Sequence, residues 1–199
     1  MKRNSHTEKS MKLKLTPTKK RMNQISRIGI AVFTVFLATA FTLPVELEKK
    51  SLLDDKVELL VPQDFEIMSE EMMKTKYPSE RRPTLVYTNE SGGINVALNL
   101  TQNPADQGIL SLYKDNFVQS FKNAYPSAEW KDSGMKEING KQVGYLELVT
   151  PALDTEIYNL MFFTNLDGKL LLCTFNCTKK SMEEWTPTAK EIMNSLKIK

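Results

Sequence analysis

Hydrophobic and polar residues follow two different periods between residue 57 and the C-terminus. Short apolar runs, alternating or continuous and bounded by glycine, proline or asparagine, predict β-strands. Such runs occupy residues 57–61, 65–67, 85–88, 94–100, 135–138, 142–149, 156–164 and 169–175. Asn139-Gly140 and Asp167-Gly168 separate consecutive runs and are typical of two-residue hairpin turns, and Ser91-Gly92-Gly93 forms a further turn. The last four runs therefore predict an antiparallel meander.

Two segments have the helical period instead. Ser69 can cap a helix over Glu70–Tyr77, and the acidic residues of its first turn favour a helix N-terminus. Apolar residues three and four apart predict an amphipathic helix over Gly108–Tyr125, which Pro126 ends.

The last helix has two possible starts. Ser181 and Glu184 form a capping box, but a helix that begins there would contain Pro187. Thr186 as N-cap would place Pro187 at the first helical position, where its missing N–H costs nothing. We therefore expect a short turn at Ser181–Trp185 and a main helix that starts at Pro187.

Two of the predicted strands are apolar at nearly every position. They read IYNLMFF at 157–163 and LLLCTF at 170–175. A strand with one solvent-exposed face alternates, so these strands predict a sheet that is covered on both faces by helices. The fold class is α+β.

Residues 57–199 resemble the PsbP-like and Mog-like family, which includes bacterial envelope proteins of the DcrB kind. The matching pieces, in order, are VPQDF, VYTNESGGINVALNLT, the middle helix, INGKQVGYLEL, NLMFFTNLDGKLLLCTFNCT and EEW before the last helix. The resemblance implies a three-layer α/β/α sandwich with a central, mainly antiparallel sheet. It also implies an accessory or binding role, because most members are not enzymes. No binding site of the family maps residue by residue onto this chain.

The charge of the chain is distributed unevenly. Residues 1–27 hold nine lysines and arginines and one acid, and form a basic N-terminal tail. The remaining 172 residues carry 18 basic and 23 acidic side chains. The folded part would therefore repel phosphate, and we expect no nucleic-acid partner.

An uncharged apolar segment, residues 28–45, follows the tail. Its 18 residues are at the low end of what a membrane-spanning helix needs. A basic flank, an apolar run and Ala38-Thr39-Ala40 are typical of a signal peptide cleaved after Ala40. The long basic region indicates either that Met11 or Met22, rather than Met1, is the true start, or that the segment is an uncleaved signal-anchor.

Both alternatives place the rest of the chain on the outer side of the cytoplasmic membrane. The domain is secreted or periplasmic if cleavage occurs, and otherwise belongs to a single-pass membrane protein with its N-terminus inside. In the second case residues 28–45 contact the membrane. Residues 46–56 (ELEKKSLLDDK) are short and charged, and we interpret them as a linker to a domain over 57–199.

The sequence lacks the residues for common catalytic or metal centres. His6 is the single histidine and lies in the tail, so serine–histidine and cysteine–histidine arrangements are excluded from the domain. Cys173 and Cys177 would lie about 13 Å apart on one strand, which is too far for a disulfide. We expect no catalytic residue, no metal and no cofactor.

Four residues are candidate contacts with a protein or small ligand. Arg81 and Arg82 lie between two prolines and suit an anionic group, although they could equally belong to a solvated loop. Trp130 and Trp185 would be partner anchors if exposed, and core-rim residues if not. The residues thus favour a non-enzymatic exported or membrane-anchored binding module. The alternatives are a scaffold whose basic tail touches anionic lipid and a carboxylate-dependent hydrolase.

Overall fold

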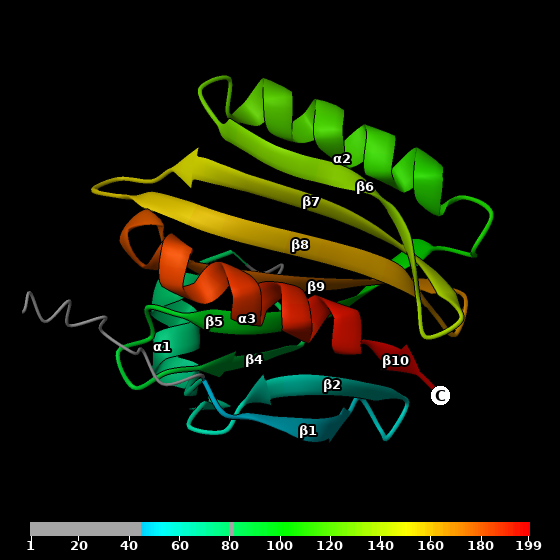
Figure 1. Ribbon diagram of the computed structural model, residues 1–199, viewed down its shortest axis with the longest axis horizontal. Coiled ribbons are helices and arrows are strands. Elements are labelled where there is room, and N and C mark those ends of the chain that lie inside the picture. Colours follow the sequence, from blue (N-terminus) through cyan, green and yellow to red (C-terminus); the bar gives the residue numbers. More distant parts are fainter. Residues whose placement is uncertain (1–44, 80–81) are drawn as a thin grey trace, which may run out of the picture. The chain divides into compact units, whose positions relative to one another are not determined.

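The computed structural model describes residues 45–79 and 82–199, and its main element is an antiparallel seven-stranded sheet (Figure 1). The strands follow the order β3-β4-β5-β9-β8-β7-β6, and each pairs antiparallel with its neighbours. Their bounds are β3 Glu66–Ile67, β4 Leu85–Thr88, β5 Asn95–Pro104, β6 Glu129–Ile138, β7 Lys141–Pro151, β8 Glu156–Leu166 and β9 Lys169–Thr178. The predicted meander corresponds to β6–β9, and β6 begins six residues earlier than predicted because its first half is polar and exposed.

The predicted linker over residues 46–56 is wrong, because most of it is a strand. β1 (Leu47–Leu52) pairs antiparallel with β2 (Val57–Pro62), and β2 also pairs with β10 (Lys197–Ile198) to complete a second, three-stranded sheet. Leu52 is buried, and Glu48 and Lys50 on the same face of β1 are half-buried, whereas Lys49 and Ser51 on the other face are exposed. The charged residues give the segment the composition of a linker, although its inner face joins the core.

Two layers cover the large sheet, one on each face. α1 (Glu70–Lys76) and α2 (Leu110–Ala124) cover one face, and α2 lies along β6, β7 and β8 (Figure 1). α3 (Met182–Ser195) and the small sheet cover the other face. The predicted three-layer α+β fold is confirmed, with the difference that a sheet shares one outer layer with a helix.

The continuous apolar strands are explained by this arrangement. On β8, Tyr158, Leu160 and Phe162 face the core below α3, whereas Met161 and Phe163 face the core below α2. Alternate residues thus enter opposite cores, so that nearly every position of the strand is buried. β9 has the same pattern, with Cys173 and Cys177 as buried free thiols whose pKa values are raised by burial.

The final helix begins earlier than expected. A 3-10 turn at Lys179–Ser181 leads directly into α3, and Pro187 lies inside the helix. The expectation of a separate helix from Pro187 is therefore wrong. Thr186 is not an N-cap; its hydroxyl donates to the carbonyl of Met182 at 2.7 Å within the first turns. Packing of the helix against the sheet outweighs the lost proline hydrogen bond.

The predicted basic tail and nearly all of the apolar segment over 28–45 lie outside the described residues. Within the residues that the structure describes, no helix is long and apolar enough to cross a membrane. The choice between signal peptide and signal-anchor stays a prediction.

Gly144 on β7 marks a close approach between strand and side chain. A Cβ at this position would overlap the ring of Phe163, which also meets Phe117 of α2 edge-on at 5.1 Å. Gly144→Ala should therefore lower the free energy of unfolding by about 1–3 kcal/mol through overpacking. Chemical denaturation measures this loss.

The matched control is Ser133→Ala on the exposed part of β6, which should change stability by less than about 0.5 kcal/mol. Equal effects of the two substitutions would contradict the close packing at Gly144.

Candidate functional site

Arg82, one residue of the predicted arginine pair, contacts the backbone at the end of α1. Arg82 is exposed, and its Nε donates to the carbonyl oxygens of Tyr77 at 2.9 Å and Ser79 at 3.3 Å. The guanidinium thus satisfies backbone groups just after α1, which is a structural role. Arg81 lies outside the described residues, and its predicted contact remains a prediction.

Trp130 belongs to the rim of a core. Its ring is half-buried on β6 and packs against the cluster below α2, and Lys122 of α2 lies over it with Nζ 5.9 Å from the ring centroid. The lysine covers the indole, so this tryptophan is a poor anchor for a partner.

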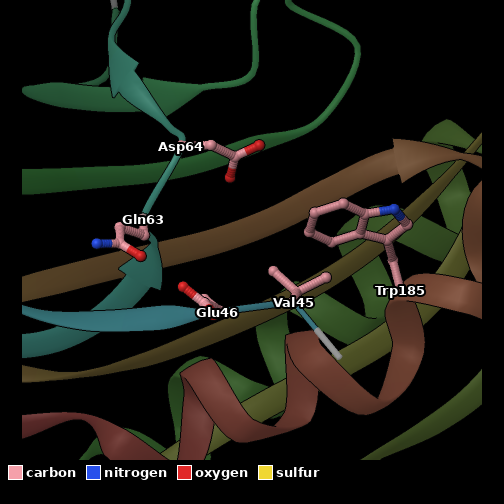
Figure 2. Close-up of a pocket in the computed structure, with 5 residues that line it drawn as sticks. All are labelled: Val45, Glu46, Gln63, Asp64 and Trp185. Carbon is pink, nitrogen blue, oxygen red and sulfur yellow. The ribbon is translucent and has the colours of Figure 1, made fainter. Parts of the chain in front are cut away.

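Trp185 occupies a different setting, at the wall of a cavity. Its ring stacks at 5.9 Å on Phe175 and lies 5.8 Å from Phe65, which fixes its orientation against the core. The half-buried indole lines a cavity of about 350 Å³ together with Val45, Glu46, Gln63 and Asp64. Figure 2 shows Trp185 projecting from α3 toward Val45, with Gln63 and Asp64 on the segment that follows β2.

A second cavity, of about 510 Å³, lies beside the first and shares Asp64 with it. Its apolar wall includes the buried Met68, the half-buried Met72 and Ile67, whose side chain is 62% exposed. Ile67 belongs to β3, an edge strand of the large sheet. An isolated apolar residue with this exposure beside a hollow is suited to a partner contact.

Among the residues that the structure describes, four acidic side chains line these two cavities, and no lysine or arginine does. They are Glu46, Asp64, Glu66 and Glu90, all exposed. None of them forms an ion pair with another residue of the described ranges. We call the joined cavities, with these four acids, Trp185, Ile67 and Met72, the acidic groove.

Other carboxylates of the domain are neutralised. Glu58 lies within 3.2–4.0 Å of Lys199, Lys197 and Lys49, and a hydrogen bond from Lys199 is the main cause of its lowered pKa. Glu129 pairs in the same way with two lysines, which lower its pKa. Among the described residues, the four acids of the groove thus lack the lysine partners that Glu58 and Glu129 have.

The acids of the groove are spread along its walls and do not converge on one point. In the ranges 45–79 and 82–199, no group of three or more histidine, cysteine, aspartate or glutamate residues is placed to hold a metal ion. Separate carboxylates beside apolar surface are suited to a ligand with several positive charges on aliphatic stems. This chemistry corresponds to a basic protein segment.

Comparisons with known proteins establish the fold. No model of a known protein family matches the chain, and no curated protein matches it. The solution structure of cyanobacterial PsbP (CyanoP) from Synechocystis sp. PCC 6803 is similar, with a TM-score of 0.57 and 16% identity over 80% of this chain and 96% of that one. LpqN, involved in cell envelope biogenesis of Mycobacterium tuberculosis, has a TM-score of 0.51 and 12% identity over 77% and 90% of the two chains. The chain thus has a PsbP-like fold.

Sequence reasoning found Trp185 but missed the acids around it. Glu46 lies in the segment interpreted as a linker, and Asp64 and Glu66 flank the buried Phe65, with Glu66 as the first residue of β3. The pairing of β1 with β2 brings them together, and the N–H of Gln63 donates to the carbonyl of Glu46 at 2.9 Å. A signal was available in the alternation of Asp64, Phe65 and Glu66, which exposes both acids on the same side of the chain.

Substitution of acids in the groove should not lower the stability of the folded domain, whereas substitution of the ion-paired Glu58 should lower it. Glu58→Gln should lower the denaturation midpoint at pH 7, because the ionised carboxylate is stabilised in the folded state. Asp64→Asn and Glu66→Gln should leave the midpoint unchanged or raise it, because they remove unpaired charge. Thermal denaturation across a pH series measures both effects.

The loss from Glu58→Gln should disappear on acidification. Its folded pKa is lowered from the usual 4.5, so its stabilisation is present above that value and is lost as the pH falls through the folded pKa. Equal destabilisation by all three substitutions at pH 7 would show that the groove acids support the fold.

Proposed function

We propose that this chain is an exported accessory protein of the PsbP-like group, of the DcrB kind, which binds a partner and does not catalyse a reaction. The likeness to PsbP and to the envelope protein LpqN supports the fold part of this proposal. The basic tail followed by the apolar segment over 28–45 supports export. The lack of a histidine after residue 6 supports a binding role.

The partner is a basic, extended segment of another protein. A single observation carries this proposal: the four carboxylates of the acidic groove have no ion-pair partner among the described residues, although they lie beside Trp185 and Ile67. Lysine and arginine side chains place their aliphatic stems on apolar surface and their charges at its edge. A cation that lies over the face of an indole ring such as that of Trp185 is attracted by the ring.

Charge gives this interaction a measurable dependence on salt. Exposed carboxylates attract a basic partner over about 10 Å at moderate ionic strength, and the attraction weakens as salt is added. The apolar contacts with Trp185, Ile67 and Met72 do not weaken in this way. A partner that used the groove would therefore bind less tightly, but would still bind, at high salt.

The binding part of the proposal is tested with a short oligolysine peptide and the full chain in mild non-ionic detergent. Trp130→Phe leaves Trp185 as the only tryptophan, so its fluorescence reports the groove. We expect a saturable change that weakens with added salt. Asp64→Lys with Glu66→Lys should weaken binding about tenfold or more, because two attractive charges become repulsive.

Glu137→Lys on β6 is the matched control, since Glu137 is also exposed and has no ion pair in the described ranges. It changes the net charge in the same direction at a different place. If Glu137→Lys weakened binding as much per charge as the groove substitutions, the attraction would belong to the whole surface and the groove proposal would fail.

The export part is tested by intact mass of the protein from separated membrane and soluble fractions. A soluble species that begins near Phe41, recovered outside the cytoplasm, indicates a cleaved signal peptide. A membrane species that retains residues 28–45, with the domain open to protease from outside, indicates a signal-anchor. Recovery of the intact chain from the cytoplasm would overturn the proposed location.

A further inference from the structure

A third cavity, of about 200 Å³, lies between α3 and the part of the large sheet formed by β6, β7 and β8. It contains a buried carboxylate, which is unusual for the interior of an apolar sheet. Glu147 is 5% exposed in the middle of β7, where the flanking residues Leu146 and Leu148 are fully buried on the opposite face. A charge in this position must be compensated by nearby groups.

Two donors compensate Glu147, and they differ in mobility. The hydroxyl of Tyr158 donates to Oε1 at 3.0 Å, and Nζ of Lys190 lies 3.0 Å from Oε2. Tyr158 is fully buried, and its raised pKa keeps the hydroxyl protonated. Lys190 reaches in from α3 with 47% of its side chain exposed. The lysine can therefore swing into water, whereas the tyrosine cannot.

The remaining charges of the cavity are held by other partners. Asp132 accepts a hydrogen bond from the hydroxyl of Tyr145 at 3.0 Å, and Lys136 donates to Oδ1 of Asn194 at 2.8 Å. With Lys190 turned outward, the cavity wall holds two carboxylates and one ammonium. The vacated site thus has a net charge of −1, which suits one monovalent cation.

The cavity also has an apolar wall. Leu160 is fully buried and Met193 is 4% exposed. A closed apolar cavity of about 150 Å³ can hold benzene, so about 200 Å³ suffices for a short aliphatic chain. Flexible methionine side chains can adapt to such a chain.

We propose that this cavity is a binding site for a primary aliphatic amine in its ammonium form. The ammonium takes the place of Nζ of Lys190 beside Glu147, and the carbon chain contacts Leu160 and Met193. Lys190 competes with the amine for the carboxylate of Glu147, and its ammonium occupies the site when no amine is bound. This site is separate from the acidic groove, and the proposal does not depend on the proposed function.

The test titrates the full chain with n-butylamine at neutral pH and follows the methyl resonances of the methionines by NMR. A saturable shift at Met193 is expected, with none from n-butanol, which has the same carbon chain without the charge. Lys190→Ala should tighten binding several-fold, because the competitor is gone. Lys180→Ala, an exposed lysine outside the cavity, should leave the affinity unchanged.

Glu147→Gln should abolish the response to n-butylamine. If this variant does not fold, Glu147→Gln combined with Lys190→Met replaces the charged pair by a neutral one and should also give no response. Equal shifts from n-butylamine and n-butanol would overturn the proposal in favour of a simple apolar cavity. Binding to Lys190→Ala alone, with none to the native chain, would show that the pair of Glu147 and Lys190 is only structural.

Discussion

The central strands of the large sheet are apolar on both faces, so the domain requires two separate covering layers. β8 and β9 bury alternate residues in opposite cores, and exposure of either face would place large aromatic side chains in water. One layer consists of α1 and α2. The other is assembled from the two ends of the domain, because β1 and β2 open it and α3 and β10 close it. This shared layer makes the fold depend on contacts between residues far apart in sequence.

The second layer also explains where the candidate sites lie. The acidic groove is at its margin, where the chain leaves β2 and the loop at Gln63–Glu66 passes the start of α3. The amine cavity is beneath its helix, where Lys190 reaches the sheet. In both sites, charged side chains keep access to solvent at the border between this layer and the large sheet.

Local patterns predicted most of the large sheet and the middle helix, for identifiable reasons. Asn139-Gly140 and Asp167-Gly168 adopt the positive φ angles that hairpin turns need. The pairing of the strands that these turns join could therefore be predicted from the sequence. The same reasoning failed for residues 47–52, because a short strand rich in charged residues resembles a linker. It also failed at Pro187, where burial of the apolar face of α3 outweighed the cost of a proline inside a helix. Of the candidate site residues that the structure describes, Trp185 lines a cavity.

The sequence by itself determined the α+β class, the double-sided burial of the central strands and the lack of a histidine in the domain. These properties depend on residue type and on neighbours within a few positions. Only the tertiary structure decided that Glu46 and Asp64 line one cavity, and that Glu147 meets Lys190. Each of these contacts joins elements whose relative placement depends on the covering layer as a whole. The residues that compensate a charge can be far apart in sequence, so the local pattern of hydrophobic and polar residues does not predict them.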